Sequence, residues 1–179
     1  MFQRAVGLLV VGFFIALSGN VCAQTTAESD VLDKLRKLID VSDYESPSQV
    51  GAALGLQFTK RFDKFQKTIE VYSPKKVPDF ILQRAGATYF EYKIEPGGLQ
   101  QGGTSITIDF SFAPNVCISV DEFQKAFSGR ATEDPFAIRD GGFGKIFGLD
   151  TVTANTMGFA AWQGECLSMI SIENSKFKS

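Results

Sequence analysis

Two short patterns in the chain have the residue types of catalytic or phosphate-binding motifs. Ser73-Pro74-Lys75-Lys76 has the Ser-x-x-Lys spacing in which a lysine activates a serine nucleophile. That chemistry needs the serine at the start of a helix, whereas Ser-Pro is typical of a turn. Gly141-Gly142-Phe143-Gly144-Lys145 is glycine-rich but lacks the GxxxxGK[ST] spacing of a phosphate loop. We therefore expect a turn or a close backbone approach there.

The 179 residues contain no histidine, which excludes Ser-His-Asp and Cys-His catalysis and HExxH zinc sites. The acid pairs at 121–122 and 133–134 are sequence neighbours whose side chains diverge, so neither pair forms a shared-proton dyad by itself. Asp140 and Asp150 flank glycine-rich turns without a calcium-loop spacing. We expect no catalytic residue, no metal site and no cofactor, and a carboxylate-based hydrolase stays an open alternative.

Residues 1–23 have the features of a secretory signal peptide. Arg4 supplies the positive charge, residues 5–17 form an uncharged apolar run, and Val21-Cys22-Ala23 places small residues at the cleavage site. The apolar run is shorter than the about 20 residues that cross a bilayer. We expect cleavage after Ala23 and a periplasmic protein without a stable membrane span. Lipidation of Cys22 and full secretion are the alternatives.

Residues 24–179 are predicted to form a single domain. Hydrophobic residues make up 44% of the chain and charged residues 21%, as in ordinary globular proteins. The net charge of −2 argues against a nucleic-acid partner, which usually needs a basic excess. Cys117 and Cys166 are the two cysteines that follow the signal peptide. In an exported chain we expect a disulfide between them, closing a loop of about 50 residues.

Three segments have the patterns of helices. Residues 29–39 repeat apolar side chains at helical spacing, and residues 46–55 and 119–129 each begin with a serine and end at a glycine. The last two also begin with a capping-box pattern, in which the serine is followed three residues later by Gln49 or Glu122. We expect short helices at all three places.

Phe58, Phe62 and Phe65 also have helical spacing, and basic residues stand between them. The spacing predicts that the three rings are buried beneath a solvated basic face. An anion-binding surface is the alternative.

Alternating apolar and polar residues predict strands. Residues 90–95 and 105–112 alternate throughout and predict an antiparallel hairpin with one dry and one wet face. Residues 156–162 and 165–173 predict a second hairpin. Its last strand is apolar on both faces, so we expect it to be central in the sheet.

The two capped helices can be superposed, and each is followed by strands. A short helix plus an antiparallel hairpin, occurring twice, predicts an α+β fold with short helices packed on one face of an antiparallel sheet. The possible repeats are residues 29–113 and 114–174. The alternative is that any two capped helices look alike.

Residues 48–55, Ser-Gln-Val-Gly-Ala-Ala-Leu-Gly, and residues 119–129 carry a further likeness. They resemble the Thr/Ser-x-x-Gln/Glu-Val-x-x-x-Leu-Gly motif of the small exported proteins typified by the β-lactamase inhibitory protein and the outer-membrane assembly lipoprotein BamE. The Gly-Met that usually precedes the cap is absent, and only one disulfide is available. The resemblance implies an exported protein that grips another protein through its sheet face and loops.

Two loops and a few aromatic residues are the predicted contact elements. The loop at 96–103 is longer than a hairpin needs and has one apolar side chain among four glycines and two glutamines. The loop at 140–145 is also glycine-rich, and Tyr89, Tyr72 and Trp162 are candidates for the outer face of the sheet. The candidate partner-binding residues are Leu99, Gln100, Gln101, Tyr89, Phe143 and Lys145.

We therefore expect a non-enzymatic periplasmic protein that binds another protein. An inhibitor or immunity protein that blocks a toxic or lytic envelope enzyme by steric occlusion fits these features, and an acidic chain suits a basic hydrolase or toxin. A carrier of a small apolar ligand such as a lipid is the main alternative, because some of the 17 phenylalanines could line a cavity.

Overall fold

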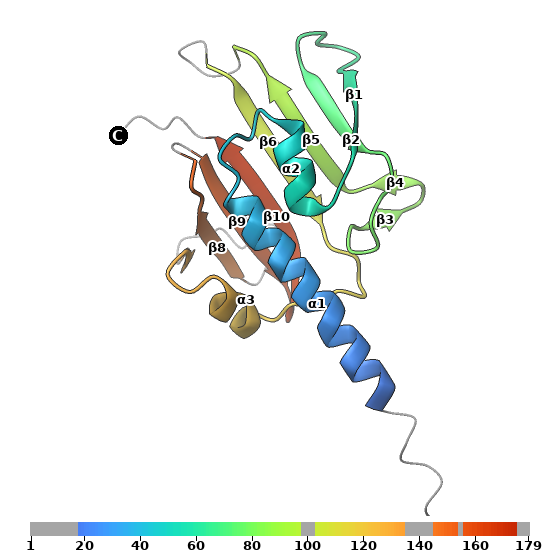
Figure 1. Cartoon of the computed structure of the whole chain (residues 1–179), viewed down its shortest axis with the longest axis vertical. Helices are drawn as coiled ribbons and strands as arrows, with labels where there is room; N and C mark the ends of the chain where they lie inside the picture. Colours follow the sequence, from blue (N-terminus) through green and yellow to red (C-terminus); the bar gives the residue numbers. More distant parts are fainter. Residues whose placement is uncertain (1–17, 98–102, 135–144, 154–155, 175–179) are drawn as a thin grey trace, which may run out of the picture.

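The computed structural model describes residues 18–97, 103–134, 145–153 and 156–174, and their side chains from residue 27 onward. Within these residues one large antiparallel sheet lies behind three helices (Figure 1). Helix α1 spans Ser18–Ile39, α2 spans Pro47–Leu54 and α3 spans Val120–Ala126. Most of the predicted signal peptide lies outside the described residues, and α1 begins ahead of the expected start near residue 29.

Eight strands form the sheet in the order β1-β2-β5-β6-β10-β9-β8-β7, and every neighbouring pair is antiparallel. The strands are β1 Phe58–Phe62, β2 Glu70–Pro74, β5 Phe90–Glu95, β6 Ser105–Ser111, β7 Ala131–Glu133, β8 Lys145–Asp150, β9 Thr156–Gln163 and β10 Cys166–Asn174. A separate two-stranded hairpin joins β3 (Gln83–Arg84) to β4 (Ala87–Thr88). The expected hairpin at 90–112 and the central position of the last strand are confirmed.

The expected α+β fold built from two helix-plus-hairpin units is wrong, because the sheet dominates the described structure. Helix α2 is followed by the four sheet strands β1, β2, β5 and β6, and α3 is followed by β7 to β10. The two sets of strands meet where β6 pairs with β10. Strands such as β7, with three residues, and β8, with a glycine inside it, lack a clear alternation, so the sequence pattern underestimates the strand content.

The capping pattern is confirmed at α3 and wrong at α2. The hydroxyl of Ser119 accepts the N–H of Glu122, and the Glu122 carboxylate accepts the N–H of Ser119 at 2.9 Å. At α2 the N-cap is Ser46, but its side chain caps no helix N–H. Gln49 instead accepts a hydrogen bond from the Ser42 hydroxyl at 3.1 Å. The shared Ser-x-x-Gln/Glu pattern therefore has two different local structures.

The prediction of a helix at residues 58–65 is wrong, because Phe58–Phe62 form strand β1. A spacing of four residues fits one turn of a helix, but it is also even, so it keeps two side chains on the same face of a strand. The expected burial of all three rings is also wrong. Phe58 is partly buried, whereas Phe62 is 56% exposed and Phe65 is 82% exposed.

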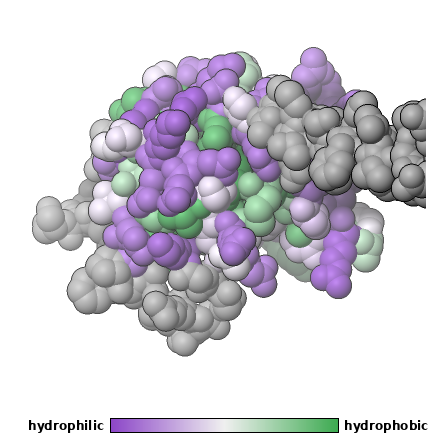
Figure 2. All heavy atoms as spheres, turned by 90° about the horizontal axis from the view of Figure 1, so that it is seen from below, coloured by the Kyte–Doolittle hydropathy of each residue, from purple (hydrophilic) through white to green (hydrophobic). Residues whose placement is uncertain are grey.

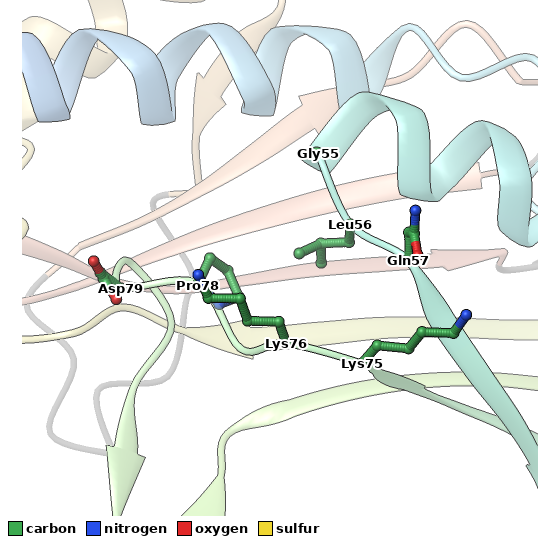
Figure 3. A pocket seen from close by; sticks show the side chains of 7 residues that line it. All are labelled: Gly55, Leu56, Gln57, Lys75, Lys76, Pro78 and Asp79. Atoms are coloured by element: carbon green, nitrogen blue, oxygen red, sulfur yellow. The ribbon is translucent and has the colours of Figure 1, made fainter.

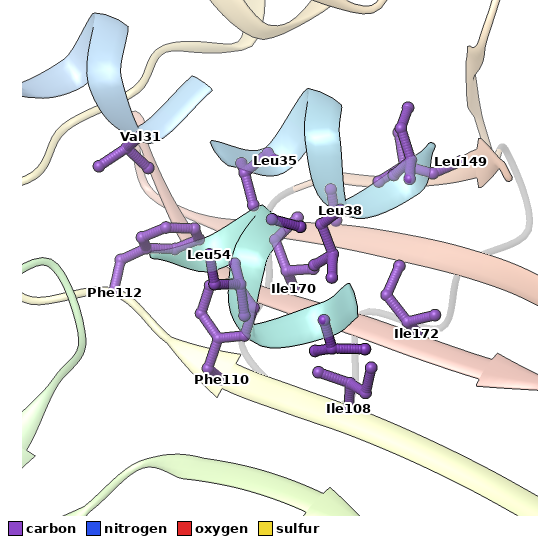
Figure 4. Close-up of a cluster of buried hydrophobic side chains, with 14 of the residues drawn as sticks. Val31, Leu35, Leu38, Leu54, Ile108, Phe110, Phe112, Leu149, Ile170 and Ile172 are labelled. Carbon is purple, nitrogen blue, oxygen red and sulfur yellow. The ribbon is translucent and has the colours of Figure 1, made fainter. Parts of the chain in front are cut away.

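The hydrophobic core fills the space between the helices and one face of the sheet (Figure 4). Its residues include Val31, Leu35, Leu38, Leu54, Ile108, Phe110, Phe112, Leu149, Ile170 and Ile172. Two large buried side chains in this core have hydrogen-bond partners: the Trp162 indole donates to the carbonyl of Ile118 at 3.0 Å, and the Tyr92 hydroxyl donates to the carbonyl of Tyr44 at 2.6 Å. Burial raises the pKa of both Tyr44 and Tyr92.

Cys117 and Cys166 form a disulfide, which confirms the expected pairing. The bond joins the segment before α3 to the first residue of β10. Beside it, the N–H of Leu167 donates to the carbonyl of Ile118 at 2.9 Å. The second half of the sheet is therefore held covalently to the chain that precedes it.

The helices turn charged side chains to solvent, such as Arg36 of α1, which pairs with Asp33 at 2.7 Å. Seen from below, most of the visible surface is hydrophilic, and hydrophobic side chains show in smaller areas between the charged ones (Figure 2). Within the part of the chain that the structure describes, no helix has the length and apolar character needed to cross a membrane.

Candidate protein-binding face

The strand register divides the side chains of the sheet between two faces. Tyr92, Ile108 and Ile172 stand side by side across β5, β6 and β10 and are buried beneath the helices. Their sequence neighbours point to the opposite side, because successive side chains of a strand alternate. We call this opposite side the outer face. The three described helices all lie on the other side of the sheet (Figure 1).

Apolar side chains gather on the half of the outer face formed by β8, β9 and β10. Met157 of β9 is 46% exposed, and Phe159, two residues along the same strand, is partly exposed. Ile146 of β8 and Met169 of β10 both pair with Ala161 in the next row. Apolar side chains that are exposed or partly exposed on adjacent strands are typical of a protein contact, and methionine side chains adapt to the shape of a partner.

Charged side chains gather on the neighbouring half, around the junction of β6 and β10. Glu91 of β5 pairs with Asp109 of β6, and Asp109 pairs with Ser171 of β10. The Ser171 hydroxyl donates to the Glu173 carboxylate at 3.3 Å, and the Lys93 ammonium lies 2.6 Å from Glu91. Three carboxylates and one ammonium therefore share this half, which gives it a negative charge.

Asp109 is the most unusual of these groups. Burial raises the pKa of its carboxyl, and the nearby carboxylates of Glu173 and Glu91 raise it as well, while the neighbouring Ser171 and the charge of Lys93 lower it. Its Oδ1 atom is buried and has no hydrogen-bond partner within the described residues. The negative charge of Asp109 is therefore unfavourable in the folded protein at neutral pH.

A carboxyl with a raised pKa beside other carboxylates is also the arrangement of a general acid. Here the group lies on the sheet face opposite the helices and lines neither of the two pockets found near α2. Catalysis needs a concave site that holds a substrate against the acid, and neither of these two pockets of the described residues lies beside Asp109. The described residues also contain no group of three or more Asp, Glu or Cys side chains that could hold a metal ion.

Those two pockets lie next to each other between α2 and the β1–β2 hairpin, with volumes of about 510 and 500 Å³. The first of them, lined by Leu56, Lys76 and Asp79 among others, is drawn in Figure 3. The lysine of β1, Lys60, is paired with Glu70 at 2.5 Å, so its charge is compensated. Lys75 and Lys76 line the pockets too, and both are exposed. Because solvated lysines are mobile and bind ions as simple point charges, they give the pockets little selectivity.

Comparisons with known proteins found no relative of this chain: no protein family, no curated protein and no solved structure matches it. Functional inference therefore rests on the geometry of the outer face.

The described contact residues predicted from the sequence do not gather in one place. Tyr89 is 45% exposed, and its carbonyl accepts the N–H of Ser111 at 3.0 Å, so it extends β5 in the outer-face row of Met169. Lys145 is exposed and pairs with Trp162, which lies on the helix-covered face. Leu99, Gln100, Gln101 and Phe143 lie outside the described residues.

The remaining candidates from the sequence lie where their side chains serve the fold and not a contact or catalytic site. Tyr72 and Trp162 are buried on the helix side of the sheet. Ser73 lies within β2 and not at a helix start, so the Ser-x-x-Lys pattern lacks its required geometry. Sequence reasoning missed Met157 and Phe159. Their alternation with a glycine and an alanine along β9 was the signal that could have found them.

Proposed function

We propose that this protein is a non-enzymatic exported protein that covers another protein with its outer face. The observation that supports this most is the apolar half of the sheet face that the three described helices leave uncovered, where Met157, Phe159 and Met169 lie on adjacent strands. A rigid sheet can be presented to a partner with little ordering of the backbone, which lowers the entropic cost of association.

The proposed partner is a basic enzyme of the cell envelope, and the proposed role is that of a periplasmic inhibitor or immunity protein that blocks a toxic or lytic activity by steric occlusion. The carboxylates of Glu91, Asp109 and Glu173 lie next to the apolar half, so a partner with basic side chains at the rim of its contact surface has complementary charge. The resemblance of residues 48–55 to the family of the β-lactamase inhibitory protein and BamE belongs to the same proposal and rests on the sequence motif.

Met157→Lys is the variant that tests this contact. Met157 stands between Asp150 of β8 and Glu173 of β10, so a lysine fits the local charge of the sheet while placing an ammonium in the apolar contact. Val152→Lys is the matched control. Val152 is 56% exposed, and its N–H donates to Ile39 at the end of α1, which places it on the helix side.

The experiment is affinity capture from a cell-envelope extract with the wild type and both variants, after circular dichroism has shown that all three are folded. We expect the wild type and Val152→Lys to retain one partner in stoichiometric amount, and Met157→Lys to lose it. Failure of the wild type to retain a stoichiometric partner at any salt concentration, or retention of the same partner by Met157→Lys, contradicts the proposal.

A further inference from the structure

The β1–β2 hairpin, residues 58–74, carries the most exposed phenylalanines of the described chain. Phe65 lies in the turn and is 82% exposed, and Phe62 at the end of β1 is 56% exposed. Figure 1 shows the turn at the end of the molecule opposite the N-terminal end of α1. Two rings of this size in water expose apolar surface that a folded protein normally buries.

The turn that presents Phe65 is held by hydrogen bonds. Oδ1 of Asp63 accepts the N–H groups of Phe65 at 2.8 Å and of Gln66 at 3.0 Å, and these bonds lower the pKa of the Asp63 carboxyl. The backbone of Asp63 and Ile69 also pairs across the turn at 2.9 Å. These hydrogen bonds fix the conformation of the turn, and this conformation exposes the Phe65 ring.

The hairpin is basic in an acidic protein. Its charged residues are Lys60, Arg61, Lys64, Lys67, Asp63 and Glu70, so its net charge is 4 − 2 = +2, against −2 for the whole chain. Both carboxylates are engaged, Asp63 by the turn amides and Glu70 by Lys60 and Tyr72. Arg61, Lys64 and Lys67 form no ion pair within the described residues.

The cations lie close to the rings. The ammonium of Lys64 is 4.7 Å from the centroid of the Phe65 ring, and that of Lys60 is 5.2 Å from the centroid of the Phe62 ring. Apolar and positively charged groups thus project together at the end of one hairpin, which is the composition of segments that lie in the interface of anionic membranes.

We propose that this hairpin is a peripheral membrane anchor, in which Phe62 and Phe65 insert into the interface of an anionic lipid bilayer and Arg61, Lys64 and Lys67 contact the lipid phosphates. The alternative is that the hairpin binds another protein. Protein contacts place an aromatic anchor at the centre of a broad patch whose rim excludes water, and they bury about 800 Å² on each partner. A narrow turn offers no such rim, whereas a lipid surface needs only an apolar tip and surrounding cations.

The test is co-sedimentation of the folded full chain with vesicles of phosphatidylcholine alone or with added phosphatidylglycerol. We expect binding to the vesicles with phosphatidylglycerol and its loss at high salt, because exposed charges are screened. Phe65→Ser should weaken this binding about tenfold, from the apolar area that no longer leaves water. Lys64→Gln should weaken it about fivefold.

Controls of the same chemistry lie elsewhere on the surface. Val152→Ser and Lys76→Gln remove an exposed apolar and an exposed basic side chain outside the hairpin and should bind vesicles as the wild type does. Met157→Lys should also keep vesicle binding, which separates this proposal from the proposed function. The proposal is overturned if the wild type does not bind anionic vesicles. It is also overturned if Val152→Ser and Lys76→Gln lose as much vesicle binding as Phe65→Ser and Lys64→Gln do. Loss of a captured protein by Phe65→Ser without any vesicle binding assigns the tip to a protein partner instead.

Discussion

Asp109 of β6 and Ser171 of β10 stand directly opposite each other where the two halves of the sheet meet, on the face that the helices leave open. Ser171 is buried, and Oδ1 of Asp109 is enclosed without a hydrogen-bond partner in the described chain. A charged carboxylate in this position lowers the free energy of unfolding of the protein.

Asp109→Asn should stabilise the protein at neutral pH. Because the pKa of Asp109 is raised in the folded state, the folded chain binds this proton more tightly than the unfolded chain does. Protonation thus contributes stability that is fully present below the unfolded pKa and is lost as the pH rises through the folded pKa. The melting temperature of the variant should exceed that of the wild type at pH 7, and the two should converge below about pH 3.

Asp79→Asn, at an exposed position, is the control for this measurement and should leave the melting temperature unchanged. A variant Asp109→Asn that melts below the wild type at pH 7 would show that the Asp109 charge is favourable where it stands.

Removing the disulfide should lower the free energy of unfolding by about 4 kcal/mol, the loop-closure value for a loop of this length. The bond spans 49 residues and fixes the segment before α3 to β10. Denaturant unfolding of the wild type with and without reductant measures the loss. The Cys117→Ser, Cys166→Ser double variant should match the reduced wild type and should not respond to reductant, and an unresponsive wild type would contradict the expectation.

Arg130 joins the end of α1 to the end of β8. Its guanidinium donates to the carbonyl of Ile39 at 3.1 Å and to the carbonyl of Asp150 at 2.8 and 3.2 Å, and it pairs with Asp40 at 2.5 Å. Arg130→Ala should therefore lower the free energy of unfolding by about 1–3 kcal/mol, because the carbonyls of Asp150 and Ile39 lose the guanidinium donors, although Ile39 keeps the N–H of Val152.

Arg130→Lys should recover little of this loss, since an ammonium cannot reproduce the fork of donors. Arg84→Ala, at an exposed position of β3, should have almost no effect on the same denaturant curve. A lysine variant as stable as the wild type would show that the charge alone suffices.

Gly51→Ala should destabilise α2 although alanine is the better helix former by about 1 kcal/mol. A Cβ atom on Gly51 would lie 2.6 Å from the carbonyl oxygen of Leu56, and the N–H of Leu56 donates to the carbonyl of Gly51 at 2.7 Å. Backbone cannot move away as a flexible side chain can, so we expect a net loss of about 1–3 kcal/mol in thermal unfolding. An increase in melting temperature would mean that propensity outweighs the contact.

The sequence correctly predicts those elements whose local residue pattern is sufficient to specify a helix or a strand. The alternation in β5 and β6 identifies both strands and their buried face, and the Ser119–Glu122 box marks the start of α3. Strand β1 is missed, because the spacing of Phe58 and Phe62 fits a helix and a strand equally well.

The outer face is harder to predict, because β9 is apolar on both sides. Which side is covered depends on α3, whose Phe123 ring packs against Trp162 at a centroid distance of 4.8 Å. Only that packing leaves Met157 exposed on the other face. Of the predicted contact residues, Tyr89 follows from strand alternation and lies on the outer face.

Titration of the captured envelope enzyme with this protein tests the central claim most directly. If the outer face covers the partner, one equivalent of the wild type should abolish the activity of the enzyme, and Val152→Lys should do the same. At least tenfold more Met157→Lys should be required, since the contact would have to desolvate the ammonium, which costs well over 1.4 kcal/mol even beside Asp150 and Glu173. Equal inhibition by Met157→Lys and the wild type, or turnover of the enzyme's substrate by the purified protein itself, would contradict it.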